Sequence, residues 1–235
     1  MLHVVPTPIG NLGDITVRAL EVLRAVDLIA AEDTRHTRRL LTHYGIDRPL
    51  ASYHEHNERR RAVDIAGRLE RGEAVALVTD AGTPTVSDPG FRILEECIAR
   101  GLAYSVLPGA SSVVVAAAAC GFGGGRFFFG GFLPVKSGQR RREIGEALRR
   151  DEFSLYFESP HRLLKSLAVL AELDRARLLC VCRELSKRHE EIRRGSAPEL
   201  IERYSAHPPR GEIVLAVAGA GGRRRTAGRA TDAAG

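Results

Sequence analysis

Five short segments of the sequence carry side chains that can bind a ligand or accept a proton, and each follows a short apolar run. They comprise residues 6–14, 32–35, 54–58, 80–84 and 108–112. Charged side chains dominate two of them, and carboxylates and imidazoles can accept protons. The others consist mainly of proline, glycine and small residues, which let a ligand approach the backbone. Turn chemistry explains any one segment alone, but the five together predict a preformed ligand-binding surface.

The most informative stretch is residues 77–90, with the sequence LVTDAGTPTVSDPG. The apolar run at 74–78 is typical of a buried strand, and small and turn-forming residues follow it at once. Gly82 permits backbone angles that other residues resist. Asp88 is placed to cap a helix that begins near Pro89. Because ligands of open parallel sheets bind beyond the carboxyl ends of the strands, we expect a ligand at this loop.

An alternation of strands and helices positions these segments in the first half of the chain. Apolar runs predict strands at residues 2–7, 27–31, 50–53, 74–78 and 102–107. Between them, helical patterns occupy residues 14–24, 34–44, 58–71 and 89–100, and a small-residue helix follows Ser112. This order predicts a mostly parallel sheet covered on both faces. The five segments then share one edge of that sheet.

The second half predicts a different sheet. Strands are expected at residues 127–132, 153–157, 177–181, 190–194 and 212–218, with helices at 137–150, 161–173 and 198–204. The fold class is therefore α/β with two domains, residues 1–120 with a mostly parallel sheet and residues 121–220 with a mixed sheet. Residues 221–235 are basic and lack apolar residues for a core, so we expect a disordered tail.

Composition narrows the class of protein. A hydrophobic content of 44% with 27% charged residues is typical of a soluble globular protein. No apolar run reaches the length of a membrane span, and the first residues show no export signal. The four cysteines lack zinc-like spacing, and His54 and His56 lack an apparent third ligand. We therefore expect a cytoplasmic protein without a metal site.

The charge balance is compatible with a partner that carries negative charge, such as phosphate groups. The net charge is +6, and arginines cluster at residues 59–61, 140–142 and 193–194. Such clusters can bind phosphates. Each cluster alone is more often a solvated surface, so only their combined position can decide between the two.

The chain also contains longer motifs: VPTPIGNLGDIT from residue 5, EDTRHT from 32, LVTDAGTPTVSDPG from 77, VLPGASS from 106, YFESPHRL from 156, and CREL with the following Lys187 and HEE from 182. Together these motifs resemble the tetrapyrrole methylase superfamily. Within that superfamily the motifs are most similar to the branch that methylates the ribose 2′-hydroxyl of a cytidine in 16S ribosomal RNA. The resemblance extends over about residues 2–218, which is nearly the whole chain.

This resemblance implies a homodimer that binds S-adenosylmethionine in a cleft between two α/β domains. It also implies the small ribosomal subunit, with its 16S RNA, as the partner. The implied cofactor-binding residues are Pro8, Asp80, Ala81, Gly82, Thr83, Val86, Ser111 and Ser112 in the first domain, and Tyr156, Phe157, Ile213 and Val214 in the second.

Methyl transfer to a hydroxyl requires alignment of the oxygen with the methyl–sulfur bond and an acceptor for the hydroxyl proton. Among the acidic and histidine side chains of the motifs we favour Glu158, and next Asp33, because each follows a predicted strand. Ion pairing among these charges explains about half of them equally well. The residues expected to contact the RNA are Glu32, Arg35, His54, Asn57, His161, Arg162, Glu184 and Lys187.

Two other functions remain open at this point. One is methylation of a carbon in a tetrapyrrole precursor, against which stands Gly82-Thr83-Pro84, where those relatives usually carry Gly-Asp-Pro. The other is a non-catalytic RNA-binding module, which would need only the basic clusters. It would not explain the loops of proline and glycine.

Overall fold

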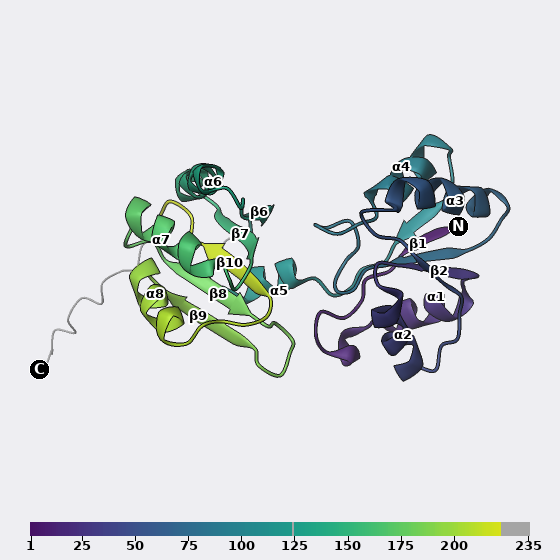
Figure 1. The fold of residues 1–235 in the computed structure, drawn as a ribbon, viewed down its shortest axis with the longest axis horizontal. Coiled ribbons are helices and arrows are strands. Elements are labelled where there is room, and N and C mark those ends of the chain that lie inside the picture. Colours follow the sequence, from purple (N-terminus) through teal and green to yellow (C-terminus); the bar gives the residue numbers. More distant parts are fainter. Residues whose placement is uncertain (124, 222–235) are drawn as a thin grey trace, which may run out of the picture. The chain divides into compact units, whose positions relative to one another are not determined.

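The computed structural model describes residues 1–123 and 125–221. It divides into two compact units, Met1–Ser112 and Val113–Gly235 (Figure 1). The division lies eight residues before the predicted boundary at residue 120, so the small-residue helix α5 (Ser112–Ala119) groups with the second unit. Arg194 explains this grouping, because its Nε donates to the carbonyl oxygen of Cys120 at 2.7 Å. The predicted tail, apart from Gly221, lies outside the described residues.

A parallel five-stranded sheet forms the centre of the first unit. Its strands are β1 (Leu2–Val4), β2 (Leu28–Ala31), β3 (Leu50–Ser52), β4 (Val75–Val78) and β5 (Tyr104–Val106). They lie in the order β3-β2-β4-β1-β5, and all pairs are parallel. The parallel sheet predicted from the sequence is confirmed. Consequently the five strand-end loops all leave the sheet at its carboxyl edge.

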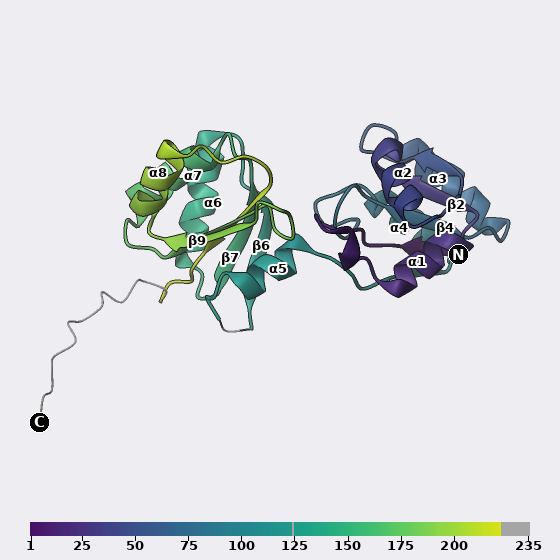
Figure 2. The same ribbon diagram turned by 90° about the horizontal axis from the view of Figure 1, so that it is seen from below.

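Helices cover both faces of this sheet (Figure 2). On one face lie α1 (Val17–Ala25) and α2 (Thr34–His43), after a short 3₁₀ turn, η1 (Leu12–Asp14). On the other lie α3 (Glu58–Glu70) and α4 (Phe91–Ala99). Alternate residues of a strand point to opposite faces. Both faces are packed, so β2 and β4 are buried along their whole length.

The start of α4 differs from the sequence prediction. The helix begins at Phe91, and its N-cap is Gly90, which makes no side-chain capping bond. The predicted cap by Asp88 is therefore wrong. Gly90 has φ = 134°, and a Cβ atom there would lie 2.8 Å from Leu77 Cδ2. The chain thus packs against β4 at a point where only glycine fits.

The second unit contains a mixed sheet, as predicted. Its strands are β6 (Phe127–Phe132), β7 (Phe153–Glu158), β8 (Leu179–Arg183), β9 (Glu191–Gly195) and β10 (Ile213–Val217), in the order β6-β7-β10-β8-β9. Only β6 and β7 pair in parallel, and the other three pairs are antiparallel. The last strand, β10, thus lies at the centre of the sheet.

Three helices, α6 (Ser137–Arg149), α7 (Leu163–Leu173) and α8 (Ala197–Ala206), pack on this sheet. Leu163, Leu167 and Leu170 of α7 are fully buried in the core. Arg177 is also buried and donates hydrogen bonds to the carbonyl oxygens of Ala218 and Leu148. In the part of the chain that the structure describes, no helix is long and apolar enough to cross a membrane.

Candidate functional site

Three strand-end loops of the first unit are tied together at the carboxyl edge of the sheet. Thr7 and Gly82 exchange two backbone hydrogen bonds of 2.9 Å each. The hydroxyl of Thr7 donates to the carbonyl oxygen of Thr79 at 3.0 Å. The hydroxyl of Thr83 donates to the carbonyl oxygen of Ala110 at 3.1 Å. The loops that follow β1, β4 and β5 therefore form one connected surface.

Two glycines allow these loops to approach closely. Gly82 has φ = 81°, in the left-handed region that favours glycine. A Cβ atom on Gly109 would lie 2.6 Å from Cβ of Pro6, so no side chain fits there. Half-buried small residues, Ala81 and Ala110, complete this surface. The result is a backbone-lined cradle, which fits the close approach expected of a cofactor.

Val86 belongs to a part of the same loop with unusual backbone geometry. Its neighbours Thr85 and Ser87 have φ values of 74° and 67°. Such angles in residues other than glycine cost about 1–3 kcal/mol each. Val86 itself is exposed. Of the other predicted cofactor residues, Pro8, Ser111 and Ser112 are half-buried on or beside this edge.

Three carboxylates gather beside the cradle. Asp80 accepts a hydrogen bond through Oδ1 from the backbone N–H of Asp33 at 3.1 Å. Its own N–H donates to Oε2 of Glu32 at 3.4 Å. Burial raises the pKa of Glu32, and the neighbouring charges of Asp80 and Asp33 add to that rise. A carboxylate with a raised pKa is the better proton acceptor.

Asp33 has the opposite electrostatic character. Its carboxylate accepts hydrogen bonds from the Arg35 guanidinium at 2.8 and 3.1 Å. It also accepts one from the Arg35 backbone N–H and thereby caps α2. These contacts hold the pKa of Asp33 far below its usual range. A carboxylate in this state is a weak base, and its contacts serve the start of the helix.

The loop that follows β3 is held in place by hydrogen bonds among its own residues. The backbone N–H of His54 donates to Asn57 Oδ1 at 2.9 Å. Asn57 Nδ2 lies 3.1 Å from His54 Nε2 and 3.2 Å from Ser52 Oγ. His54 Nδ1 is buried without a hydrogen-bond partner among the described residues. Over residues 1–123 and 125–221, no group of three or more possible metal ligands occurs.

Glu158 of the second unit is enclosed. Its side chain is 0% exposed, and Oε1 lies 3.0 Å from the Arg162 guanidinium. Oε1 also accepts from the Ser159 N–H at 2.7 Å, and Oε2 accepts from the Ser166 hydroxyl. These contacts hold β7 to the start of α7. Neither oxygen can reach a substrate unless this network opens, so the predicted role as a base requires a rearrangement.

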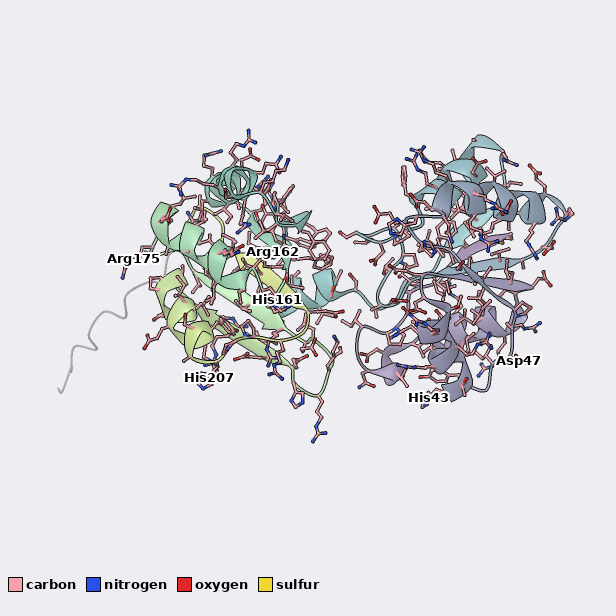
Figure 3. All side chains as sticks on the ribbon, viewed as in Figure 1. His43, Asp47, His161, Arg162, Arg175 and His207 are labelled. Atoms are coloured by element: carbon pink, nitrogen blue, oxygen red, sulfur yellow. The ribbon has the colours of Figure 1, made fainter. Side chains whose placement is uncertain are left out.

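The residues beside Glu158 differ in exposure (Figure 3). His161 is exposed, whereas Arg162 is half-buried and donates to the carbonyl oxygen of Leu133 at 3.3 Å. At the end of β8, Lys187 Nζ donates to Glu184 Oε1 at 2.8 Å and to Glu212 Oε2 at 2.9 Å. Burial acts to raise the pKa of Glu184. The hydrogen bonds from Lys187 and from the Glu212 N–H outweigh burial, so the pKa of Glu184 lies below its ordinary value.

The superfamily resemblance assigns four residues of the second unit to the cofactor. Their side chains lie on the two opposite faces of the mixed sheet. Tyr156 and Ile213 belong to the core under the helices, and the Tyr156 hydroxyl donates to Glu143 Oε1 at 2.6 Å. Phe157 and Val214 are cross-strand partners. They point to the opposite face because neighbouring residues of a strand alternate. The structure therefore brings Phe157 and Val214 together, apart from the other two.

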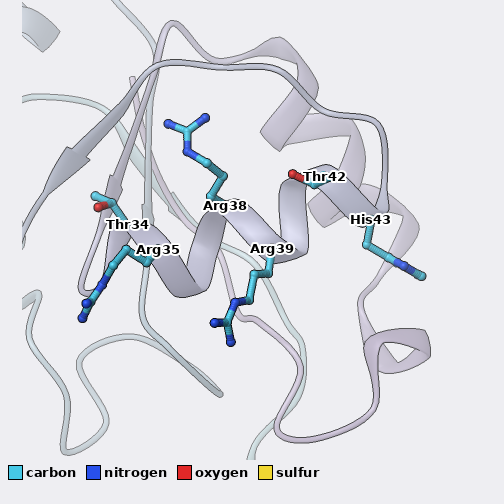
Figure 4. Close-up of a pocket in the computed structure, with 6 residues that line it drawn as sticks. All are labelled: Thr34, Arg35, Arg38, Arg39, Thr42 and His43. Carbon is cyan, nitrogen blue, oxygen red and sulfur yellow. The ribbon is translucent and has the colours of Figure 1, made fainter.

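Sequence reasoning missed a groove along α2 (Figure 4). It has a volume of about 580 Å³ and is lined by Thr34, Arg35, Arg38, Arg39, Thr42 and His43. Of these, only Arg35 was a candidate. The available signal was the recurrence of basic residues four apart in TRHTRRLLTH, a stretch without an acidic residue.

Comparison with known proteins gives a consistent result. The family model described as Tetrapyrrole (Corrin/Porphyrin) Methylases matches residues 1–201. The chain is 42% identical to ribosomal RNA small subunit methyltransferase I of Synechocystis sp., over 94% of this chain and 79% of that protein. It is 44% identical to the protein of the same name from Thermotoga maritima, over 93% of this chain and 98% of that protein.

Solved structures share the fold at low identity. The methyltransferase CobJ superposes with a TM-score of 0.70 at 19% identity, covering 92% of this chain and 93% of its own. Diphthine synthase superposes with a TM-score of 0.69 at 15% identity, covering 92% and 89%. These two likenesses concern the fold alone.

Proposed function

Because the chain belongs to the tetrapyrrole methylase family, we propose that it transfers a methyl group from S-adenosylmethionine to the ribose 2′-hydroxyl of a cytidine in 16S ribosomal RNA. The superfamily resemblance read from the motifs is confirmed. The observation that carries the proposal is the similarity to ribosomal RNA small subunit methyltransferases I along 93–94% of this chain. The family model spans all five strand-end loops. The tetrapyrrole and non-catalytic alternatives are not favoured.

The cradle around Gly82 supports binding of the cofactor. S-adenosylmethionine supplies a methyl group already activated by a sulfonium. The Asp80 carbonyl and the backbone of Ala81 would hold it, because the Asp80 N–H donates to Glu32 and both backbone groups of Gly82 bond to Thr7. Gly82 would let the cofactor approach closely, because it has no side chain. The bridge between Thr7 and Gly82 fixes this loop before a ligand arrives. Catalysis then consists mainly of holding the ribose oxygen in line with the methyl–sulfur bond.

We propose Glu32 as the acceptor of the hydroxyl proton, in preference to Glu158 and Asp33. The side chain of Glu32 lies at the cradle, half-buried beside Asp80. Its raised pKa suits proton transfer, whereas Arg35 weakens Asp33 as a base. Glu158 is enclosed by its own network. Of the three carboxylates, Glu32 is thus the one whose surroundings suit acceptance of the hydroxyl proton.

The family resemblance further leads us to propose a homodimer that acts in the cytoplasm on small ribosomal subunits. The polar side chains of the strand-end loops, including Arg35, His54 and Asn57, suit a polar polymer better than a hydrophobic ring. The remaining candidates for RNA contact are His161, Arg162, Glu184 and Lys187 of the second unit.

The proposal is tested by measuring cofactor binding and methyl transfer on one preparation. Calorimetry with S-adenosylmethionine should show binding. Small subunits lacking the modification should accept the labelled methyl group, and uroporphyrinogen should not. A 2′-O-methyl group blocks alkaline cleavage of the next phosphodiester bond, so a protected cytidine dinucleotide should appear. Transfer to uroporphyrinogen alone would establish the tetrapyrrole alternative, and failure to bind the cofactor would favour the non-catalytic module.

The role of Glu32 is tested by single-turnover methylation with Glu32→Gln. General-base contributions are about 10²–10⁴-fold, so we expect a loss of that order with cofactor affinity near wild type. Asp33→Asn and Glu158→Gln serve as matched carboxylate-to-amide variants. If Glu158→Gln loses turnover at unchanged stability while Glu32→Gln does not, Glu158 is the base.

A further inference from the structure

The exposed face of α2 is a basic stripe. Arg35, Arg39 and His43 follow one another at intervals of four residues, which places them in one row along the helix. Arg38 lies in the adjacent row between Thr34 and Thr42 (Figure 4). Thr37, Leu40 and Leu41 on the opposite side are buried against the sheet. The groove is therefore lined entirely by the solvent-facing side of one helix.

This arrangement costs helix stability. Like charges four apart, as in Arg35 and Arg39, destabilise a helix by about 0.2–0.5 kcal/mol. Cations in the first turns also oppose the helix dipole, which favours negative charge there. Asp33 offsets part of this cost by pairing with Arg35. Arg38 and Arg39 have no acidic partner within 4.0 Å in the described residues, so their charges face solvent uncompensated.

On the other face of the sheet, several arginines at the ends of the helices have acidic partners. Arg68 and Arg71 at the end of α3 both pair with Glu73, at 2.8 and 3.1 Å. Arg92 and Arg100 of α4 likewise have glutamate partners. These four arginines are thus paired within the unit, whereas Arg59 and Arg60 at the start of α3 are exposed and have no ion pair in the part of the chain that the structure describes. Arg38 and Arg39 differ from Arg59 and Arg60 because they line a groove.

We infer that the α2 groove binds the phosphodiester backbone of the RNA next to the nucleotide being methylated; this inference rests on the proposed function. The groove begins directly after Glu32 and Asp33, at the carboxyl edge where the cradle lies. With a rise of 1.5 Å per residue, the stripe from Arg35 to His43 extends about 12 Å from that edge. Arginine forks and threonine hydroxyls are common phosphate donors. The groove would hold the strand while the target ribose lies at the cradle.

The test is the salt dependence of binding to unmodified small ribosomal subunits. The double variant Arg38→Ala with Arg39→Ala removes the two unpaired charges, and alanine favours the helix. Each lost phosphate contact reduces the slope of log K against log salt by about 0.7–0.9, so we expect the slope to fall by roughly 1.4–1.8. Cofactor affinity and melting temperature should stay near wild type. The matched control is Arg68→Ala with Arg71→Ala, which removes the same net charge from two arginines that pair with Glu73.

The outcomes separate this inference from the proposed function. If the wild type neither binds nor methylates the subunit, the proposed function fails. If the wild type methylates and the α2 variant keeps its affinity and slope, the groove is not the RNA surface. If the α3 control loses the same amount of affinity and slope, net charge and not the groove determines binding, and the inference is overturned. Loss confined to the α2 variant supports it.

Discussion

The substitution Gly82→Val separates the strain of a backbone position from its use in ligand binding. Gly82 has φ = 81°, where a residue with a side chain costs about 1–2 kcal/mol or more. A Cβ atom there meets Ile9 Cγ2 at 3.6 Å and the Ala110 carbonyl oxygen at 3.9 Å, which are ordinary contacts. The penalty is therefore backbone strain, with no clash at Cβ. It is smaller than the 5–15 kcal/mol that stabilises a typical domain, so the fold should survive.

Gly72 supplies the matched control. It has φ = 88°, lies at the opposite end of β4, and has no atom within 4 Å of a built Cβ. Gly72→Val should thus carry similar strain away from any ligand. Strain of 1–2 kcal/mol lowers the melting temperature of a domain of about 100 residues by roughly 4–16 °C. We expect comparable shifts in both variants.

Cofactor affinity should distinguish the two variants. If the backbone at Gly82 touches S-adenosylmethionine, the added valine overpacks the site by about 1–3 kcal/mol, which is roughly 5–150-fold in the dissociation constant. Calorimetry should show this loss for Gly82→Val and wild-type affinity for Gly72→Val. Wild-type affinity of a folded Gly82→Val would refute the reasoning. If the valine variant fails to fold, Gly82→Ala, which adds only the Cβ atom, provides the same test.

Three further perturbations follow from the charges of the two units. Glu32→Gln should remove the rise of turnover with pH and leave the urea midpoint at pH 7 equal or higher. The folded state binds more protons than the unfolded one between the ordinary pKa of Glu32 and its raised pKa, so ionised Glu32 costs stability as pH rises; a lower midpoint would contradict this. Glu158→Gln should destabilise the second unit by about 1–3 kcal/mol, because an amide cannot accept from Arg162, Ser159 and Ser166 together; an unchanged urea midpoint would show that the network contributes nothing. Arg177→Met should cost about 3–5 kcal/mol, since it removes the pairing with half-buried Asp174 and the donor to the carbonyl groups of Ala218, Gly219 and Leu148; a loss below about 1 kcal/mol in urea unfolding would show that the pair is replaceable.

The sequence was sufficient to predict the sheets and the edge that carries the loops. Apolar runs such as residues 74–78 are short and end abruptly at turn-forming residues. These features identify the runs as buried strands and show where each strand ends. Parallel pairing then placed the loops after β1, β4 and β5 together, and the contact between Thr7 and Gly82 follows from it. These features depend on local pattern and on a topological rule.

Features set by contacts between distant residues could not be predicted. Asp88 has the chemistry of a cap, but the approach of Gly90 to Leu77 of β4 determines where the helix begins. Glu158 follows the predicted strand as a catalytic base would, yet the hydroxyl of Ser166, eight residues later, donates to its carboxylate. The groove on α2 did have a local signal, the basic residues four apart.

The central position of β10 has a consequence for the chain during its synthesis. Ile213 pairs with Glu158 on one side and with Arg183 on the other, and β7 and β8 make no pair with each other. Until β10 emerges, both strands expose a backbone edge that can pair with another nascent chain. At about 5–20 residues per second, the 59 residues from Glu158 to Val217 leave the edge of β7 open for roughly 3–12 s. A message cut short before the codon for Ile213 would therefore yield a second unit whose sheet is split in two, a species that chaperones must hold or proteases remove.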